Sequence, residues 1–297
     1  MRILVSGASG LIGSALAPFL RSERHEIVPL ARSSSAGQPA VAWDPGAGRI
    51  DADALEGFDA VVHLAGENIV GRWTAKKKAA IRNSRVRGTR MLAQALASRV
   101  RKPAVLLCAS AIGYYGHRGD EVVREGSGPG SDFLADVCRD WEAAADPARQ
   151  AGIRTVHLRF GMVLSASGGA LAKMVPAFRL GLGGVLGSGR QYMSWVDLDD
   201  VLGAIRQGLT TVSVAGPVNV VAPHPVTNAE FTKTLGRALK RPTPFPVPAF
   251  AARMLFGELA DALLFSSTRV EPAKLLQAGY RFRYPELEAS LRHLLNR

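Results

Sequence analysis

The sequence predicts an α/β protein with a doubly wound parallel sheet, followed by a smaller C-terminal lobe. Up to Phe160, short apolar runs rich in β-branched residues alternate with amphipathic segments of helical period. From Gly161 onward the chain changes to a glycine-rich section and then to shorter helical pieces. Alternating strands and helices are typical of parallel strands joined by crossover helices, so the first part predicts the sheet and the second part predicts the lobe.

The composition is that of an ordinary globular chain. Of the 297 residues, 47% are hydrophobic and 21% are charged, which excludes a disordered chain. The chain shows no charged and then apolar leader, and no uncharged apolar run approaches the roughly 20 residues that span a bilayer. The two cysteines, Cys108 and Cys138, lack the spacing of a disulfide framework or a zinc site. We therefore expect a soluble, cytoplasmic protein with no metal and no membrane partner.

The net charge of +12 raises the question of a nucleic-acid partner. The cations are spread along the chain and are dense only between Lys76 and Arg90, where the other face of the expected helix is apolar. A solvated basic helix face is the favoured explanation, with an acidic ligand or a nucleic acid as the alternatives. We expect no nucleic-acid partner, and the sequence leaves the oligomeric state open.

Three glycines, Gly7, Gly10 and Gly13, separate the first expected strand from the first expected helix. The run from Ile3 to Val5 predicts a buried strand, and the segment from Ser14 to Glu23 has apolar residues at one-turn spacing. A glycine-rich turn between a strand and a helix lets the backbone approach a pyrophosphate, whose charge is stabilised by the helix N-terminus. The turn therefore predicts a dinucleotide site in a Rossmann-like sheet.

The remaining elements of the first part follow in the same alternation. Further strands are expected at His25 to Ala31, Ala60 to Ala65, Ala104 to Ser110 and Arg154 to Phe160. Further helices are expected at Ala75 to Val100 and Ser131 to Gln150. The stretches Ser33 to Gly37 and Gly126 to Ser131 are expected to be loops.

We expect residues 1–165, with a contribution from 195–222, to form the dinucleotide-binding domain. Residues 166–297 are expected to form mainly the substrate-binding lobe. Within it, Thr227 and Glu230 have the spacing of a capping box at a helix start. Pro272 and Gly279 bracket another short helix.

Arg32 and Ser33 follow the second expected strand, where an acidic residue accepts hydrogen bonds from the adenosine ribose in NAD sites. An arginine there instead suits the 2′-phosphate of NADP, because a guanidinium pairs with an anion. The alternative is that Arg32 is a surface residue at a strand end. We expect NADP(H) as the cofactor.

Seven segments of the chain carry a resemblance to a known family. The first four are GASGLIG from Gly7, HLAGEN from His63, RVRGT from Arg85 and ASAIGYYG from Ala109; the others are ENIVGRW, GLGGVLGSGRQYMSWVDLDDV and APHPVTNAEF. With these segments the chain resembles an extended or atypical short-chain dehydrogenase/reductase. More narrowly, it is similar to the epimerase-like branch often described as nucleoside-diphosphate-sugar epimerases. The resemblance covers nearly the whole chain and implies a Rossmann-like fold.

The resemblance also implies a set of cofactor contacts. It places the pyrophosphate at Gly7, Ser9, Gly10, Leu11, Ile12 and Gly13. It places Leu64, Ala65 and Gly66 beneath the riboses, with Arg85 where related enzymes commonly carry asparagine. It places Ala109, Ser110, Gly161, Met162 and Val163 near the nicotinamide.

The superfamily's usual catalytic pair, Tyr-x-x-x-Lys on a helix, is missing from the chain. When Glu142 is aligned with the acidic residue that often follows the pair, Leu134 and Cys138 occupy its two positions. Neither side chain can replace a tyrosine whose proton transfer is assisted by a nearby cation. The catalytic candidates that remain are Ser110, Tyr114 and Tyr115. Glu67 and His117 are alternatives.

The substrate cleft is expected between the carboxyl ends of the strands and the C-terminal lobe. Arginine suits a phosphate and tryptophan suits a ring, although packing or loop anchoring explains each residue equally well. The substrate candidates are Asn68, Trp73, Arg159, Arg190 and Trp195. We expect an NADP(H)-dependent oxidoreductase or epimerase acting on a nucleotide sugar or another small carbonyl or hydroxyl compound. The alternative is a non-catalytic NADP(H)-binding protein with a regulatory or redox-sensing role.

Overall fold

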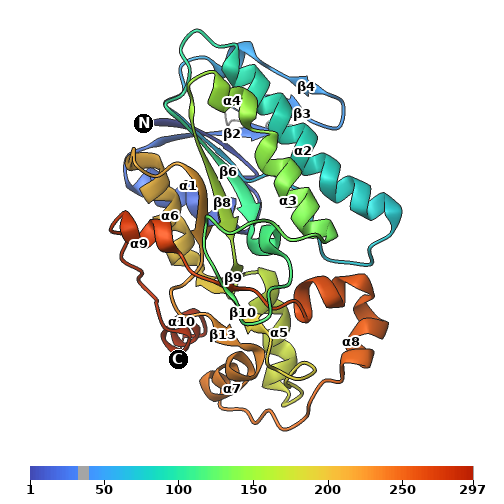
Figure 1. Ribbon diagram of the computed structural model, residues 1–297. Helices are drawn as coiled ribbons and strands as arrows, with labels where there is room; N and C mark the ends of the chain where they lie inside the picture. The colour runs from blue at the N-terminus through green and yellow to red at the C-terminus, as the bar shows by residue number, and fades with distance from the viewer. Residues whose placement is uncertain (33–39, 297) are drawn as a thin grey trace.

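The computed structural model describes residues 1–32 and 40–296 and is built around a mostly parallel sheet (Figure 1). The sheet has eight strands in the order β12-β8-β6-β5-β1-β2-β3-β4. Only the pair β3 and β4 is antiparallel. The strands are β1 (Arg2–Ser6), β2 (Glu26–Ala31), β3 (Val41–Asp44), β4 (Arg49–Ile50), β5 (Ala60–His63), β6 (Val105–Ala111), β8 (Arg154–Phe160) and β12 (Gly216–Val220).

This strand order contains a topological switch between β1 and β5. From β1 the chain moves outward through β2, β3 and β4, then returns to β5 on the other side of β1 and continues through β6, β8 and β12. Crossovers that leave in opposite directions open a crevice at the carboxyl ends of the two central strands. The predicted Rossmann-like α/β class is confirmed, and the strand order places the ligand crevice expected of such sheets at the ends of β1 and β5.

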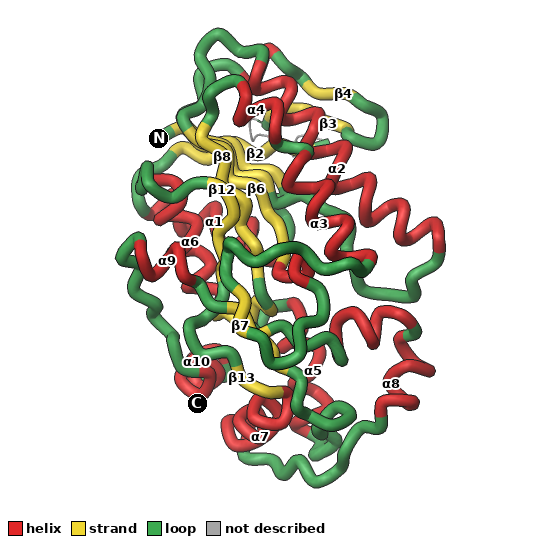
Figure 2. The backbone as a smooth tube through the Cα atoms, in the orientation of Figure 1, coloured by secondary structure: helices red, strands yellow, loops and turns green. Residues whose placement is uncertain are grey.

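Helices cover both faces of the sheet, as Figure 2 shows. One face is covered by α1 and α6, and their apolar side chains join a core with Ile3, Val62 and Val156. The other face is covered by α2 and α4 around Leu4, Val61 and further buried residues, while α3 packs on α2. These helices are α1 (Leu11–Ser22), α2 (Ala75–Ala97), α3 (Phe133–Ala143), α4 (Asp146–Gln150) and α6 (Leu198–Thr210), with short 3-10 turns η1 (Asp53–Leu55) and η2 (Ile112–Tyr115).

Several helix boundaries differ from the sequence prediction; the helix expected from Ala75 to Val100, for example, ends at Ala97. The single helix expected from Ser131 to Gln150 is two helices, α3 and α4. Pro147 lies in the first turn of α4, where its missing N–H is tolerated, whereas in a continuous helix it would break the backbone ladder. The first helix begins at Leu11, three residues before the expected Ser14, so its N-terminus follows the glycine turn directly.

The C-terminal lobe contains short elements around a second core. Trp195, Phe231 and Leu291 are among its buried residues. Its helices are α5 (Gly169–Arg179), α7 (Asn228–Leu239), α8 (Ala249–Phe256), the π-helical turn η3 (Ala260–Leu264), α9 (Ala273–Gln277) and α10 (Leu287–Leu294). Its strands pair as β9 (Met162–Leu164) with β11 (Trp195–Asp197), β10 (Tyr192–Met193) with β13 (Val226–Thr227), and β7 (Val122–Val123) with β14 (Arg269–Val270).

Two local predictions for the second half, a capping box and a short helix, are confirmed. The capping box at Thr227 and Glu230 starts α7, with both reciprocal hydrogen bonds present. The short helix bracketed by Pro272 and Gly279 is α9. Within residues 195–222, α6 contacts α1 and β12 pairs with β8, so this stretch returns to the main sheet. The loop expected at 33–37 lies outside the described residues.

The two parts of the chain touch beside the carboxyl ends of the strands. Trp73, Ile81 and Val137 from the sheet domain pack with Leu259 from the lobe. Lys78 of α2 also pairs with Glu258. Among the described residues, no helix has both the length and the apolar character needed to cross a membrane.

Candidate functional site

The glycine turn between β1 and α1 has a backbone that other residues cannot adopt without rearrangement. Gly7 has a φ of 68°, and a Cβ on it would lie 2.9 Å from the backbone N of Ala65. A Cβ on Gly13 would lie only 2.2 Å from the carbonyl oxygen of Gly7. The turn is therefore folded tightly on itself and against the segment that follows β5.

The N-terminus of α1 presents backbone N–H groups at this turn. The N–H of Gly10 donates to Gly7, and the first intrahelical bond runs from Ser14 to Gly10. The N–H groups of Leu11, Ile12 and Gly13 thus have no partner within the helix. The first turn of α1 carries no acidic residue, and Ser9 and Gly10 are exposed. Such a helix end attracts an anion such as a pyrophosphate.

The hydroxyl of Ser6, which the sequence analysis missed, joins the two central strands below the turn. It accepts hydrogen bonds from the N–H groups of Leu64, at 3.1 Å, and Ala65, at 3.2 Å. Its single hydrogen is therefore donated to Nδ1 of His63, 2.6 Å away. Nε2 of His63 then carries a hydrogen and donates to Thr89 at 3.0 Å. Only the tertiary pairing of β1 with β5 reveals this arrangement.

His63 gives the fold a pH dependence. Burial lowers the pKa of this imidazole from 6.5 to about 4. Below pH 6.5 the imidazole of His63 is protonated in the unfolded chain, whereas in the folded chain it stays neutral down to about pH 4. The contribution of His63 to stability is therefore complete above pH 6.5 and is lost as the pH falls. Between those pH values we expect wild type to lose about 3 kcal/mol more unfolding free energy than His63→Gln, at 1.36 kcal/mol per pKa unit. Urea titrations at each pH would measure this, and parallel curves for the two proteins would contradict it.

The segment after β5 forms the second wall of the crevice. Leu64 and Ala65 are half-buried, and Gly66 is exposed. Arg85 of α2 donates from Nη1 to the carbonyl of Glu67 at 3.0 Å, and a Cβ on Gly66 would lie 3.4 Å from its guanidinium carbon. Burial lowers the pKa of Arg85. Arg85 therefore holds the backbone of this segment in place.

The ends of β2, β6 and β8 supply the other predicted cofactor residues. Arg32 is exposed directly after β2, whereas Ser33 lies outside the described residues. Ala109 is buried near the end of β6. Gly161 connects β8 to β9, where Met162 and Val163 are half-buried. All these chain segments end on the same side of the sheet because their strands are parallel.

The start of α5 also reaches the glycine turn, which the sequence analysis missed. A Cβ on Gly168 would lie 3.0 Å from Cδ1 of Leu11, and one on Gly169 would lie 3.1 Å from Cδ2 of the same side chain. The paired glycines thus let the N-terminal end of α5 approach the start of α1. In the sequence, the adjacent glycines Gly168 and Gly169 are the feature that could have indicated this close approach.

A buried polar network lies beneath the ends of β6 and β8. Glu142 of α3 accepts two hydrogen bonds of 2.8 Å from Arg159, and a 2.7 Å bond from the hydroxyl of Ser110. Arg159 donates further to the hydroxyl of Tyr115 at 2.9 Å. That hydroxyl donates to Asn219 of β12 at 2.7 Å. The network joins three strands and one helix through side chains alone.

This network changes the roles expected for three of its members. Arg159 is only 2% exposed, and Tyr115 is completely buried. Burial alone would lower the pKa of Arg159. The hydrogen bonds that its guanidinium donates to Glu142, and the negative charge of that carboxylate, outweigh burial and raise the pKa. Burial raises the pKa of Tyr115, which disfavours its ionised form. In this structure the side chains of Arg159, Ser110 and Tyr115 are thus each held by hydrogen bonds within the network.

Tyr114 differs from its neighbour. It is half-buried at the end of the turn η2, and its ring centroid lies 3.5 Å from the guanidinium carbon of Arg159. Its hydroxyl makes no hydrogen bond to the residues that the structure describes. Gly116, with a φ of 66°, ends the turn, so Tyr114 and Arg118, four residues later, do not lie on one helix face.

The face of α3 that lies against Gly113 of η2 presents Leu134 and Cys138. A Cβ on Gly113 would lie 3.4 Å from Cβ of Leu134 and 3.9 Å from Sγ of Cys138. Burial raises the pKa of the Cys138 thiol to about 12. These are the two residues that the sequence alignment places at the positions of the usual tyrosine and lysine.

The expected substrate residues are distributed between the core and the surface. Trp195 is completely buried and its indole N–H donates to the carbonyl of His224, so it packs in the lobe core instead of lining a cleft. Trp73 is 9% exposed and donates to the carbonyl of Ile69, which gives it a packing role between the two parts. Asn68 and Arg190 are exposed.

The two alternative acid–base residues are also engaged. Glu67 is paired with Lys77 at 2.6 Å, and the hydrogen bond and charge of that lysine lower the pKa of its carboxyl group. His117 accepts a hydrogen bond at Nδ1 from the backbone of Ser267. Each side chain thus has a structural partner.

Comparisons with known proteins agree with this geometry. Residues 3–221 match the family model described as the NAD dependent epimerase/dehydratase family, and residues 247–294 match a domain of unknown function. An epimerase family protein of Mycobacterium bovis is 44% identical over 296 residues, which cover 99% of this chain and 98% of that protein.

Solved structures are similar as well. The crystal structure of human epimerase family protein SDR39U1 (isoform 2) with NADPH matches at a TM-score of 0.89 and 34% identity, covering 100% of this chain and 99% of that one. UDP-N-acetylglucosamine 4-epimerase from Bacillus cereus matches at a TM-score of 0.77 over 99% of this chain and 98% of that one. Because its identity is 16%, this second likeness concerns the fold alone.

Proposed function

Because the chain belongs to the NAD-dependent epimerase/dehydratase family, we propose that it binds NADP(H) and acts as an oxidoreductase or epimerase on a small carbonyl or hydroxyl compound, a nucleotide sugar among the candidates. The observation that carries this proposal is the glycine turn, with its open N–H groups at the start of α1. The similar human protein, crystallised with NADPH, supports the choice of cofactor.

The residues present fit a dinucleotide. The N–H groups of Leu11, Ile12 and Gly13 would hold the pyrophosphate, in a turn that a Cβ on Gly7 or Gly13 would push apart. Leu64 to Gly66 would lie beneath the riboses, and Gly161 to Val163 near the nicotinamide. When bound, the cofactor supplies or accepts a hydride. The chain's own task is then to orient the substrate and to move one proton.

Arg32 tests the choice between the two cofactors. Replacing Arg32 by aspartate should weaken NADPH binding at least about tenfold, because a charge-assisted contact worth about 1.4 kcal/mol or more becomes a repulsion. NADH binding should change little or improve. Fluorescence titration of both cofactors would measure this. Arg21→Asp, at the far end of α1, is the matched control and should leave both affinities unchanged. An unaltered preference in Arg32→Asp would remove Arg32 from the site.

We propose Tyr114 as the proton donor and acceptor. Its hydroxyl is the one phenol of the network region that is not already held by hydrogen bonds among the described residues. The guanidinium of Arg159 against its ring places a positive charge where negative charge develops as the phenol loses its proton. Arg159 itself is fixed by Glu142 and so cannot move away.

Tyr114→Phe should lower turnover about a hundredfold while NADPH affinity stays within about twofold, since general acid–base groups contribute at least that much. Tyr115→Phe is the matched control. It should cost about 1–3 kcal/mol of stability, because Arg159 and Asn219 each lose a buried partner, and should preserve turnover per folded molecule. NADPH oxidation with a panel of carbonyl compounds and sugar nucleotides would be the assay. Full activity in Tyr114→Phe would exclude this role.

A second function, NADP(H) binding without turnover, is favoured by one observation. The α3 residues that meet η2 are Leu134 and Cys138, and the hydroxyl of Ser110 is held by Glu142. If the protein binds NADPH but no compound of the panel oxidises it, this regulatory function replaces the enzymatic one.

A cytoplasmic location remains part of the proposal, supported by the two cysteines, which are free and buried.

A further inference from the structure

An apolar patch lies on the surface of the C-terminal lobe, apart from the cofactor crevice. Its six side chains come from the segment after α5, from the segment that leads into α8 and from α8 itself; they are Leu180, Leu182, Phe245, Phe250, Met254 and Leu255. Met254 is 85% exposed and Leu255 is 75% exposed. The two segments, which Figure 1 places at the same end of the lobe, are joined by backbone hydrogen bonds from Val247 to Val185 and from Gly187 to Val247.

The patch is held in a fixed backbone. Residues 241–249 contain a proline at every second position from Pro242 to Pro248, which favours an extended and stiff chain. A Cβ on Gly184 would lie 1.8 Å from the carbonyl oxygen of Phe245, so the two segments approach as closely as only a glycine permits. Exposed side chains on such a frame lose little conformational freedom when they bind a surface.

The charge of the two segments that carry the patch is positive, although the acidic residues Glu258 and Asp261 follow α8 closely and form ion pairs with Lys78 and Arg253. Segments 166–196 and 231–257 contain no aspartate or glutamate. They contain eight basic residues: Lys173, Arg179, Arg190, Lys233, Arg237, Lys240, Arg241 and Arg253. Acidic groups from outside these segments pair with two of them, Glu288 with Arg237 and Asp261 with Arg253. The other six form no ion pair with any residue that the structure describes.

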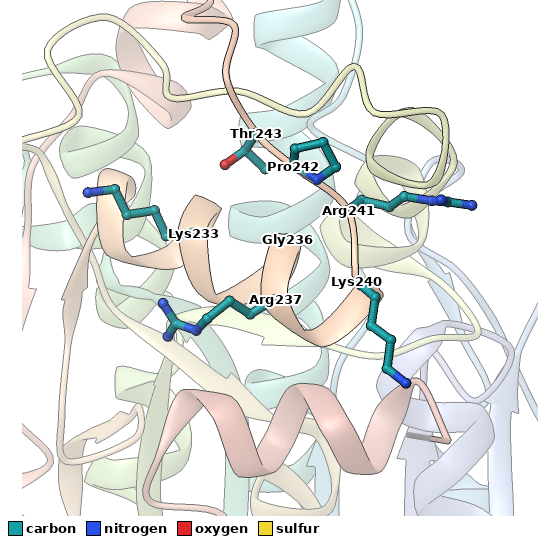
Figure 3. Close-up of a pocket in the computed structure, with 7 residues that line it drawn as sticks. All are labelled: Lys233, Gly236, Arg237, Lys240, Arg241, Pro242 and Thr243. Atoms are coloured by element: carbon teal, nitrogen blue, oxygen red, sulfur yellow. The ribbon is translucent and has the colours of Figure 1, made fainter.

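Four of these cations surround a hollow of about 440 Å³ at the C-terminal end of α7 (Figure 3). Gly236 allows the chain to cross the helix there, since a Cβ on it would lie 2.9 Å from the carbonyl oxygen of Arg241. In Figure 3, Lys233 and Arg237 point to one side, whereas Lys240 and Arg241 point elsewhere. Cations that spread apart suit an extended anionic surface better than a single small anion.

We propose that this face of the C-terminal lobe binds the surface of an anionic phospholipid bilayer. The six apolar side chains enter the boundary between headgroups and acyl chains, and the surrounding cations contact lipid phosphates and carboxylates. A second copy of the chain is a poorer occupant, because a two-fold contact would place these cations against each other. A nucleic acid would leave the apolar side chains uncovered. This proposal departs from the expectation of no membrane partner, which rested on the lack of a run long and apolar enough to span a bilayer.

Vesicle sedimentation tests the proposal with the full chain. Vesicles in which about a third of the phosphatidylcholine is replaced by phosphatidylserine should bind at least about tenfold more protein than pure phosphatidylcholine vesicles, since each cation near the surface adds roughly 1 kcal/mol of attraction. Raising the salt concentration should weaken this binding. The variant Met254→Ser/Leu255→Ser should lose most of it. Val212→Ser, which also replaces a highly exposed apolar side chain, should bind vesicles as well as wild type does.

A charge variant tests the contribution of the cations separately from that of the apolar side chains. Lys240→Glu/Arg241→Glu should reduce binding to anionic vesicles at least about tenfold, whereas Lys102→Glu, in the turn before β6, should change it by less than about twofold. Equal sedimentation with both vesicle types, or full binding by Met254→Ser/Leu255→Ser, would overturn the proposal. A dimer in light scattering that dissociates in Met254→Ser/Leu255→Ser would also overturn the proposal. Binding to duplex DNA without binding to vesicles would overturn it as well.

Discussion

Gly13→Ala is expected to raise the dissociation constant for NADPH at least about a hundredfold, equivalent to about 2.7 kcal/mol. The new Cβ would lie 2.2 Å from the carbonyl oxygen of Gly7 and 2.7 Å from the Cα of Ala8. Both contacts are with backbone, so the turn must open to relieve them. Opening it displaces the N–H groups of Leu11 and Ile12 from the position in which they would hold the pyrophosphate.

A graded control comes from the same turn. A Cβ on Gly10 would lie 3.3 Å from the same carbonyl oxygen, so Gly10→Ala should weaken NADPH binding much less. Gly126→Ala, where a Cβ meets nothing within 4 Å, should leave binding unchanged. Fluorescence titration gives the affinities, and circular dichroism shows whether each variant is folded. If folded Gly13→Ala binds NADPH like wild type, the turn is not the cofactor site.

The parts of the fold that sequence patterns predicted are those set by neighbouring residues. The strand Arg154–Phe160 has the predicted bounds, and the Thr227 capping box starts a helix where expected. The glycine turn is equally local, because its three glycines and the flanking strand and helix lie within one short stretch of chain. The break between α3 and α4 was also visible in the sequence as Pro147, but the apolar period across it concealed the break.

The role of a polar or aromatic residue could not be predicted in the same way. Arg159 and Trp195 have the side chains that ligands use, yet both are buried in the structure. Tyr115 and Asn219 are 104 residues apart, and only the pairing of β12 with β8 brings them together. The same sequence pattern, two adjacent tyrosines, thus gives one buried structural residue and one half-buried residue at the end of a turn.

These placements connect the fold to the proposed chemistry. Glu142 lies on the helix that would carry the usual catalytic pair, and it holds Arg159 in the core. Arg159 in turn lies against the ring of Tyr114. A positive charge in this region is therefore supplied from a strand, not from the helix. The consequence is that the stability of the fold and the orientation of Tyr114 depend on the same buried ion pair.

Glu142→Ala is expected to lower the free energy of unfolding by about 3–5 kcal/mol. The substitution leaves the guanidinium of Arg159 buried without a counter-charge and removes the partner of Ser110. Breaking one side of a buried pair is costly because the remaining charge stays out of water. Urea denaturation followed by tryptophan fluorescence would measure the loss. Turnover should fall as well, since Arg159 would no longer be fixed against Tyr114.

Two comparisons make this expectation specific. Glu288→Ala breaks exposed pairs with Arg292 and Arg237 and should lower the free energy of unfolding far less than Glu142→Ala, since water screens exposed charges. The double variant Glu142→Leu/Arg159→Met should recover a large part of the stability lost in Glu142→Ala, because no isolated charge remains buried, but it should not recover turnover. Equal costs for Glu142→Ala and Glu288→Ala would show that the buried pair does not hold the network. A double variant with full turnover would show that Tyr114 works without the cation.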